Sequence, residues 1–73
     1  MSKVNFYTVL NEDKVELYAD GDAYLAVDMF TKAPPRSKVI LTVWDVEGDE
    51  EYLLTPQLDV TELVRQAIAK GKQ

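Results

Sequence analysis

Residues 59–71 read DVTELVRQAIAKG, and this stretch has the clearest structural pattern in the chain. Its apolar and small residues recur with the spacing of one helix face: Val60, Leu63, Val64, Ala67, Ile68 and Gly71. Asp59 is suited to accept hydrogen bonds from the first backbone N–H groups, with Glu62 three residues later as in a capping box. The pattern predicts an amphipathic helix over residues 60–70.

The segment over residues 23–33 is harder to assign. Read with a helical period, most of its apolar side chains share one stripe. Read with a period of two, apolar and polar side chains separate poorly. Asp22 is suited to be an N-cap, and Pro34 and Pro35 disfavour helical backbone at the residue that precedes each of them. We therefore expect a helix here, with a strand as the alternative.

Two segments alternate in the way that is typical of β-strands, residues 3–10 and 38–46. An acidic turn follows each of them. A shorter apolar segment then follows each turn, at residues 15–19 and 51–55. The sequence therefore predicts two β-hairpins.

The element order is strand–strand–helix, twice. We predict an α+β fold of the ββα-ββα type, with a four-stranded antiparallel sheet and two helices on one face. If residues 23–33 form a strand, the alternative is a five-stranded β-meander or small barrel with a C-terminal helix. Residues 1–73 are expected to form a single small domain. Because Ser2-Lys3-Val4 recurs as Ser37-Lys38-Val39, we also consider an internal duplication of residues 2–33 and 37–71.

The charge distribution bears on the class of partner. The chain has thirteen acidic and eight basic residues, a net charge of -5, and all thirteen acids lie between Glu12 and Glu62. A body this negative repels nucleic-acid phosphates and anionic membranes. The longest aliphatic run, Val39 to Leu41, is too short to span a bilayer, and the N-terminus has no secretory pattern. We expect a cytoplasmic protein that binds neither nucleic acid nor membrane directly.

The composition also argues against catalysis. Cysteine and histidine are absent, which removes thiol nucleophiles, the commonest metal ligand and the commonest general base. The three glycines lie at predicted turns or helix ends and form no phosphate-binding loop. We therefore predict no enzymatic activity, no cofactor and no small-molecule substrate.

Five acids occur within seven residues of the second hairpin: Asp45, Glu47, Asp49, Glu50 and Glu51. Clustered carboxylates can bind hard cations. In an EF-hand alignment, however, Glu50 occupies the position that requires glycine, and no glutamate follows at position 12. We predict no metal site, and interpret the cluster as a solvated turn or an acidic recognition patch.

The predicted sheet has a second face that is unusually apolar. If the helices cover Val4, Phe6, Leu41 and Val43, the other face carries Tyr7, Val9, Tyr18, Ile40, Trp44 and Val46. Such a face is too aromatic and β-branched for contact with water alone, and Tyr and Trp are enriched at interaction hot spots. The alternative is that the sheet curls and buries both faces.

These features predict a non-enzymatic protein-interaction module that docks the apolar face on a second copy, as a homodimer, or on a protein partner. The alternative is an acidic nucleic-acid mimic, a phage-type decoy that blocks the basic nucleic-acid-binding groove of a host protein. In that case the five acids of the second hairpin form the working surface.

Overall fold

The computed structural model describes residues 2–53 and 55–71. The elements, in chain order, are β1 (Ser2–Leu10), β2 (Glu16–Asp20), α1 (Ala23–Lys32), β3 (Lys38–Glu47), β4 (Glu50–Leu53), β5 (Leu58–Asp59) and α2 (Thr61–Gly71). The predicted α+β class, with an antiparallel sheet and two helices, is confirmed. Since α1 is a helix, the alternative meander or barrel is wrong. The sequence pattern does not indicate β5, and residue 54 of the predicted last strand lies outside the described residues.

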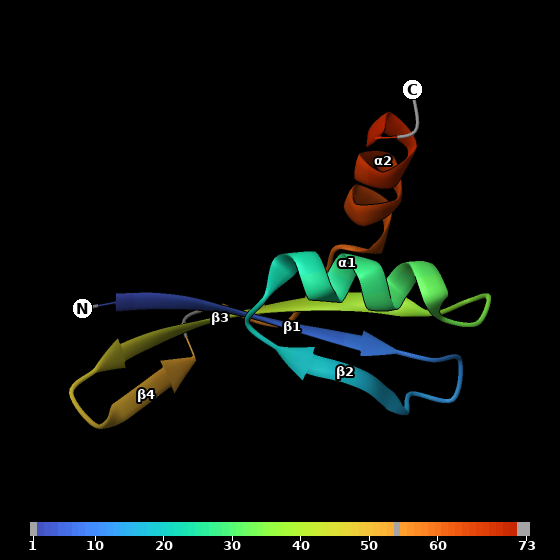
Figure 1. Cartoon of the computed structure of the whole chain (residues 1–73). Helices are drawn as coiled ribbons and strands as arrows, with labels where there is room; N and C mark the ends of the chain where they lie inside the picture. Colours follow the sequence, from blue (N-terminus) through green and yellow to red (C-terminus); the bar gives the residue numbers. More distant parts are fainter. Residues whose placement is uncertain (1, 54, 72–73) are drawn as a thin grey trace.

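The antiparallel pair of β1 and β3 forms the centre of the sheet, whose strand order is β2-β1-β3-β4 (Figure 1). β2 pairs with the C-terminal part of β1, and β4 pairs with the C-terminal part of β3. The two hairpins therefore lie at opposite ends of the central pair. β5 adds to β3 at Ile40 and Leu41, on the same edge as β4.

The register of the central pair decides which side chains face the helices. Val9 lies opposite Val39, and Phe6 lies opposite Thr42, so odd-numbered residues of both strands share one face and even-numbered residues share the other. The predicted faces combined Val4 and Phe6 of β1 with odd-numbered residues of β3. That assignment is wrong for β1, because the observed register places Val4 and Phe6 on the face opposite the helices.

The core is small and lies between α1 and the sheet. Its fully buried apolar residues are Val9, Ala26 and Val39, around which half-buried side chains pack. α1 lies along the sheet (Figure 1). The helix begins where Asp22 Oδ1 accepts hydrogen bonds from the N–H groups of Tyr24 and Leu25, at 2.9 and 3.1 Å. It ends directly before the two prolines, as the sequence predicts.

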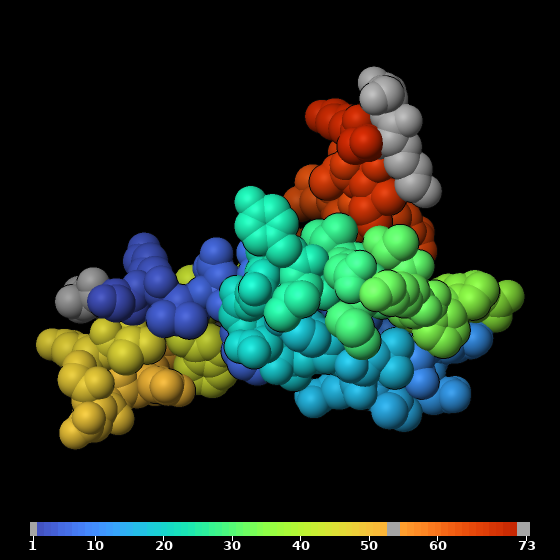
Figure 2. Space-filling view, in the orientation of Figure 1, coloured from blue at the N-terminus to red at the C-terminus, as the bar shows by residue number. Residues whose placement is uncertain are grey.

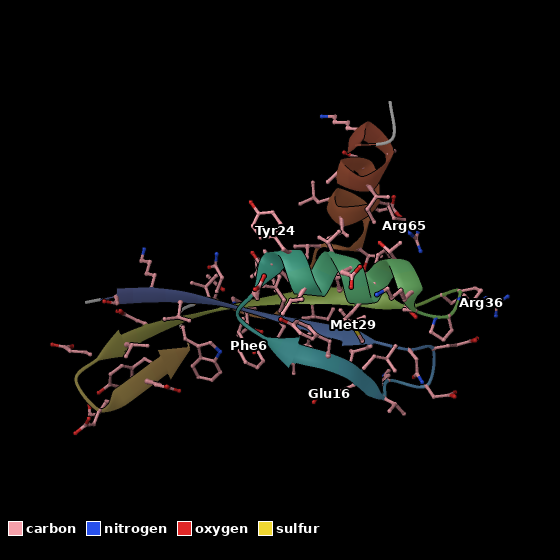
Figure 3. All side chains as sticks on the ribbon, in the orientation of Figure 1. Phe6, Glu16, Tyr24, Met29, Arg36 and Arg65 are labelled. Carbon is pink, nitrogen blue, oxygen red and sulfur yellow. The ribbon has the colours of Figure 1, made fainter. Side chains whose placement is uncertain are left out.

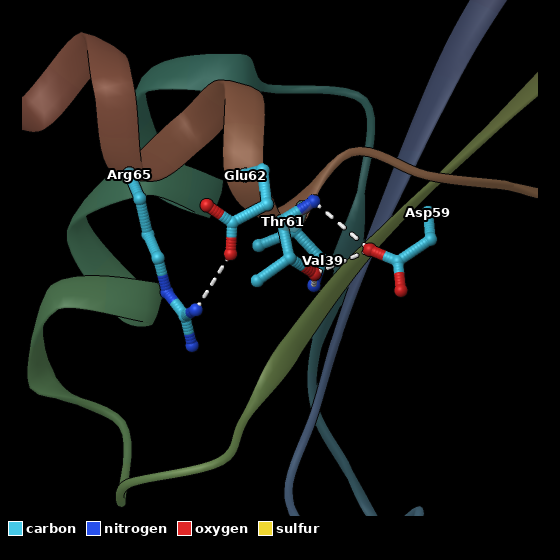
Figure 4. Close-up of polar contacts among 5 residues, drawn as sticks. All are labelled: Val39, Asp59, Thr61, Glu62 and Arg65. Carbon is cyan, nitrogen blue, oxygen red and sulfur yellow. Dashed lines mark hydrogen bonds and ion pairs between the residues drawn. The ribbon is translucent and has the colours of Figure 1, made fainter.

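α2 has a different relation to the sheet. It rises away from the sheet on the same side as α1, and it forms a separate projection from the body (Figures 1 and 2). Its first residue is held by a polar clamp, defined here as Val39, Asp59 and Thr61 (Figure 4). The Val39 N–H donates to Thr61 Oγ1 at 3.0 Å, and the Thr61 hydroxyl donates to Asp59 Oδ1 at 2.5 Å. The clamp fixes where the helix begins.

Part of the predicted capping arrangement of α2 is observed. Asp59 Oδ1 accepts from the Thr61 N–H at 3.0 Å, as expected for a residue that precedes a helix. Glu62 does not complete a capping box but pairs with Arg65 at 2.8 Å. The Arg65 guanidinium also lies 5.9 Å from the centroid of the Phe30 ring, which links α2 to α1.

The molecule is flat and extended for its size. Its principal dimensions are 40 × 30 × 18 Å and its radius of gyration is 13.1 Å. A compact domain of this length is expected to have a radius of gyration of about 11 Å. The difference reflects the projecting helix and the two hairpins that extend from opposite ends of the sheet (Figure 1).

Candidate functional site

The open face, the side of the sheet opposite both helices, carries apolar residues from both central strands. The register places six of them there: Val4, Phe6, Leu10, Ile40, Trp44 and Val46. Val4 is 43% exposed, and the other five are half-buried. Figure 3 shows Phe6 on the side of the sheet away from α1. Val4, Phe6, Trp44 and Val46 line one hollow of this face, whereas Leu10 and Ile40 line another.

The structure separates the six residues that were predicted to share one face. Ile40, Trp44 and Val46 lie on the open face. Tyr7, Val9 and Tyr18 lie on the helix side, where they belong to the core or pack against it. The placement of these three together with Trp44 is wrong. Val4 and Phe6 lie on the open face instead. Their position follows from whether even-numbered residues of β1 pair with even-numbered or odd-numbered residues of β3. No short hairpin loop joins these two strands, so the sequence does not fix that pairing.

Tyr18 has a structural role on the helix side. Its hydroxyl donates to the backbone oxygen of Asp22 at 3.1 Å, which ties β2 to the start of α1. Desolvation raises the pKa of this hydroxyl above its ordinary value, and the carboxylates of Asp20 and Asp22 act in the same direction. The ring is therefore held in place by contacts within the chain.

The open face is hollowed into a trough of about 500 Å³. We use open-face trough for the space lined by Val4, Phe6, Thr8, Glu16, Thr42, Trp44, Val46, Glu51 and Gln57. Its floor comes from β1 and β3. Glu16 of β2 and Glu51 of β4 contribute from the two edges of the sheet. The trough therefore has an aromatic and aliphatic floor between two carboxylates.

The charge of the trough has one sign. Glu16 and Glu51 are both exposed, and no basic side chain is found among its described lining residues. Carboxylates beside a low-dielectric apolar floor produce a local negative potential that attracts cations. Aromatic rings attract cations through their faces as well. The trough is thus suited to a ligand group that is both cationic and partly apolar, such as an Arg or Lys side chain.

The five acids of the second hairpin do not converge on one point. Glu51 lies opposite Val46 and shares the open face with it, whereas Asp45 lies opposite Tyr52 on the other face. Glu47 lies opposite Glu50 at the end of the ladder. Like charges directly opposite each other destabilise a strand pair. The hairpin therefore concentrates negative charge at a cost to its own stability.

Among the described residues, the polar groups of this hairpin include one paired and one unpaired carboxylate. The Tyr52 hydroxyl donates to Glu50 Oε2. Asp45 Oδ1 is buried and has no hydrogen-bond partner within the described part of the chain. Across residues 2–53 and 55–71, no group of three or more Asp or Glu side chains is arranged to hold a metal ion. Glu47, Asp49, Glu50 and Glu51 are exposed, whereas Asp45 is half-buried.

Comparison of the chain with protein-family models, with curated protein sequences and with solved structures finds no match. Neither helix in the described residues is long and apolar enough to cross a membrane.

Proposed function

We propose that the protein is a non-enzymatic protein-interaction module whose open-face trough docks a segment of a protein partner. The observation that carries this proposal is an uncovered sheet face that combines Phe6 and Trp44 with Glu16 and Glu51 in one trough. Aromatic residues supply much of the energy at interaction hot spots, and carboxylates at the rim steer a basic partner. The expected partner segment carries a basic side chain beside apolar ones. The cytoplasmic location remains a prediction from the sequence.

The chain provides its own reporter for this binding. Trp44 is its single tryptophan and lines the trough. A partner that covers the trough should shift Trp44 emission to shorter wavelength and reduce quenching by iodide. The experiment uses the full chain to capture partners from the native host, and then titrates each purified partner while Trp44 emission is followed.

Matched aromatic variants locate the contact. Trp44→Ala is expected to weaken partner binding by about 2 kcal/mol or more, which is roughly a thirtyfold rise in Kd. Tyr24→Ala on α1 is the control, because Tyr24 is 89% exposed and lies on the helix side. Calorimetry measures both affinities. Equal losses for the two variants would contradict a contact at the trough.

A charge variant tests the trough without altering its floor. Glu51→Lys places a positive charge at the rim, and Glu51 is exposed, so folding should not change. Binding of a basic partner should weaken, and its dependence on salt should become shallower. Glu62→Lys on α2 makes the same change on the helix side and should leave affinity nearly unchanged.

The acidic decoy is a second candidate function, favoured by the like-charged pair of Glu47 and Glu50. The pair opposes folding, and the same negative charge would attract a basic groove. Glu47→Lys combined with Glu50→Lys should abolish binding to a basic nucleic-acid-binding groove. The same double variant should largely preserve binding at the trough, so the two candidates give opposite results.

A further inference from the structure

The apolar stripe of α2 is only partly used within the chain. Val60 and Val64 pack against the core. Leu63 is 65% exposed, and Ala67 and Gly71 are exposed as well. These three residues follow one another at intervals of four, so they form one line along the helix. Among the described residues, this half of the stripe is therefore left exposed in spite of its apolar character.

An apolar groove lies next to this line. The helix-side groove, of about 280 Å³, runs between α1, α2 and the sheet. It is lined by Tyr7, Ala23, Ala26, Val27, Val39, Leu41, Val60, Leu63, Val64 and Ala67. No charged side chain occurs among these described lining residues. A small domain would gain stability by closing such a groove, but α2 rises away from the sheet instead of lying over it (Figures 1 and 2).

The total accessible surface of the chain is larger than that of a compact monomer of the same mass. The chain exposes 5493 Å². A compact monomer of 8.3 kDa is expected to expose about 4,600 Å². The excess of about 900 Å² is close to the ~800 Å² per partner that a standard protein interface buries. One interface with a single partner would therefore restore the surface of an ordinary domain.

α2 is self-complementary when two copies run antiparallel. A two-fold axis at Ala67 places Leu63 of one copy against Gly71 of the other, so a large residue meets the space left by a small one. Ala67 then meets Ala67, which permits a close approach.

We propose that a second copy of this chain docks on the exposed half of the α2 stripe and the helix-side groove, as a symmetric dimer with antiparallel α2 helices. This inference goes beyond the proposed function, because it uses the other side of the sheet from the open-face trough. Both surfaces can be occupied at once. Failure of one proposal leaves the other intact.

Sedimentation velocity of the full chain over a range of concentrations tests the dimer. The wild type should change from 8.3 kDa to twice that mass as the concentration rises. Leu63→Glu should raise the dimer dissociation constant at least tenfold, and since Leu63 is 65% exposed, the far-UV circular dichroism should not change. Gln66→Glu adds the same charge on the polar face of α2 and should leave the dissociation constant unchanged.

Two cysteine variants test the antiparallel geometry in a chain that has no native cysteine. Ala67→Cys should form a disulfide-linked dimer on mild oxidation, since a residue at the two-fold axis meets its own copy within disulfide reach. Ala69→Cys, an equally small change on the opposite face, should remain unlinked.

Three results would overturn the proposal. The first is a wild type that stays monomeric at every concentration. The second is a dimer that Leu63→Glu and Gln66→Glu weaken equally. The third is a dimer that Trp44→Ala disrupts and Leu63→Glu does not, which would place the second copy on the open face.

Discussion

Each half of the molecule has a hairpin followed by a helix, with the short strand β5 added before α2, but the two halves bury their helices to different extents. α1 lies along the sheet with Ala26 fully buried beneath it. α2 contacts the sheet through its first turns and leaves Leu63 and Ala67 exposed. Both helices have an amphipathic sequence. An apolar stripe thus indicates which face of a helix is favourable to bury, but it does not indicate whether residues of the same chain cover that face.

The connections to the two helices account for the difference. Only Gly21 and Asp22 separate β2 from α1, so α1 must fold back over the strands that it follows. α2 instead follows β5, which pairs with β3 at Leu41 and Ile40, and it is held at Thr61 by the polar clamp. An anchor at one end leaves the far end of the helix without a contact to the sheet. The internal duplication itself stays a prediction.

The largest loss of stability is expected from a substitution in the core, at a residue that packs with both helices. Val39 is 1% exposed and packs with residues of α1 and α2. Val39→Asp buries a charge without a partner and should cost at least about 4 kcal/mol, enough to unfold a small domain. Urea unfolding followed by circular dichroism measures this cost.

The control for that variant is Val15→Asp. Val15 is 55% exposed, so the same change should alter the free energy of unfolding by less than about 0.5 kcal/mol. If Val39→Asp were tolerated as well as Val15→Asp, the core would not lie where the structure places it.

Thr61→Val should destabilise α2 and leave α1 unchanged. Without the Thr61 hydroxyl, the buried N–H of Val39 loses its acceptor, at a cost of about 2 kcal/mol. Hydrogen exchange should become faster in α2 and at Val39, while α1 keeps its protection. Thr31→Val is the matched control, because the Thr31 hydroxyl only returns to Val27 O on the exposed side of α1. Uniform loss of protection in both helices would contradict separate anchoring.

Asp22→Ala should loosen the start of α1 in the same way, with a smaller effect. Its side chain accepts from two backbone N–H groups, and loss of an N-cap of this kind costs about 1 kcal/mol. Asp28→Ala removes an exposed carboxylate that pairs with Lys32 and should cost less than about 0.5 kcal/mol. Thermal unfolding of both variants measures the two losses of stability. A larger loss for Asp28→Ala than for Asp22→Ala would contradict the role of the N-cap.

The smallest effect concerns the pH dependence of the α2 anchor. Hydrogen bonds from the Thr61 side chain and backbone lower the pKa of Asp59 below its ordinary value of 3.8, with Lys38 and Arg65 acting in the same direction against desolvation. A lowered folded-state pKa means that the contribution of Asp59 is complete at neutral pH and is lost as the pH falls below 3.8.

An NMR titration of the Asp59 carboxyl measures this pKa directly. The midpoint should lie below 3.8 in the wild type and move towards 3.8 in Thr61→Val. A wild-type midpoint at or above 3.8 would show that the hydrogen bonds of the clamp do not stabilise the carboxylate.

Local signals predicted most of the fold. The N-cap at Asp22, the stop before Pro34 and the two alternating segments each act over a few residues, and the elements follow them closely. The register between β1 and β3 depends on pairing across an intervening hairpin and helix, so the sequence could not fix its parity. This is why Tyr7 and Val9 were assigned to the wrong face while Ile40 and Trp44 were assigned to the right one.

The candidate site was predicted to a similar extent. The aromatic content of one face and the acidity of the second hairpin are visible in the sequence. The trough that brings Glu16 of β2 and Glu51 of β4 to the same floor depends on the sheet order. The exposure of Leu63 could not be predicted either, because the pattern of α2 is that of an ordinary buried helix.

The central claim is that the chain itself completes the packing of α1, whereas association completes the packing of α2. Hydrogen exchange of the wild type, measured at high protein concentration and after serial dilution, tests it most directly. Amides of α1 should stay equally protected throughout, while amides in the C-terminal turns of α2 should lose protection on dilution. Protection of α2 that equals that of α1 at every concentration would contradict the claim.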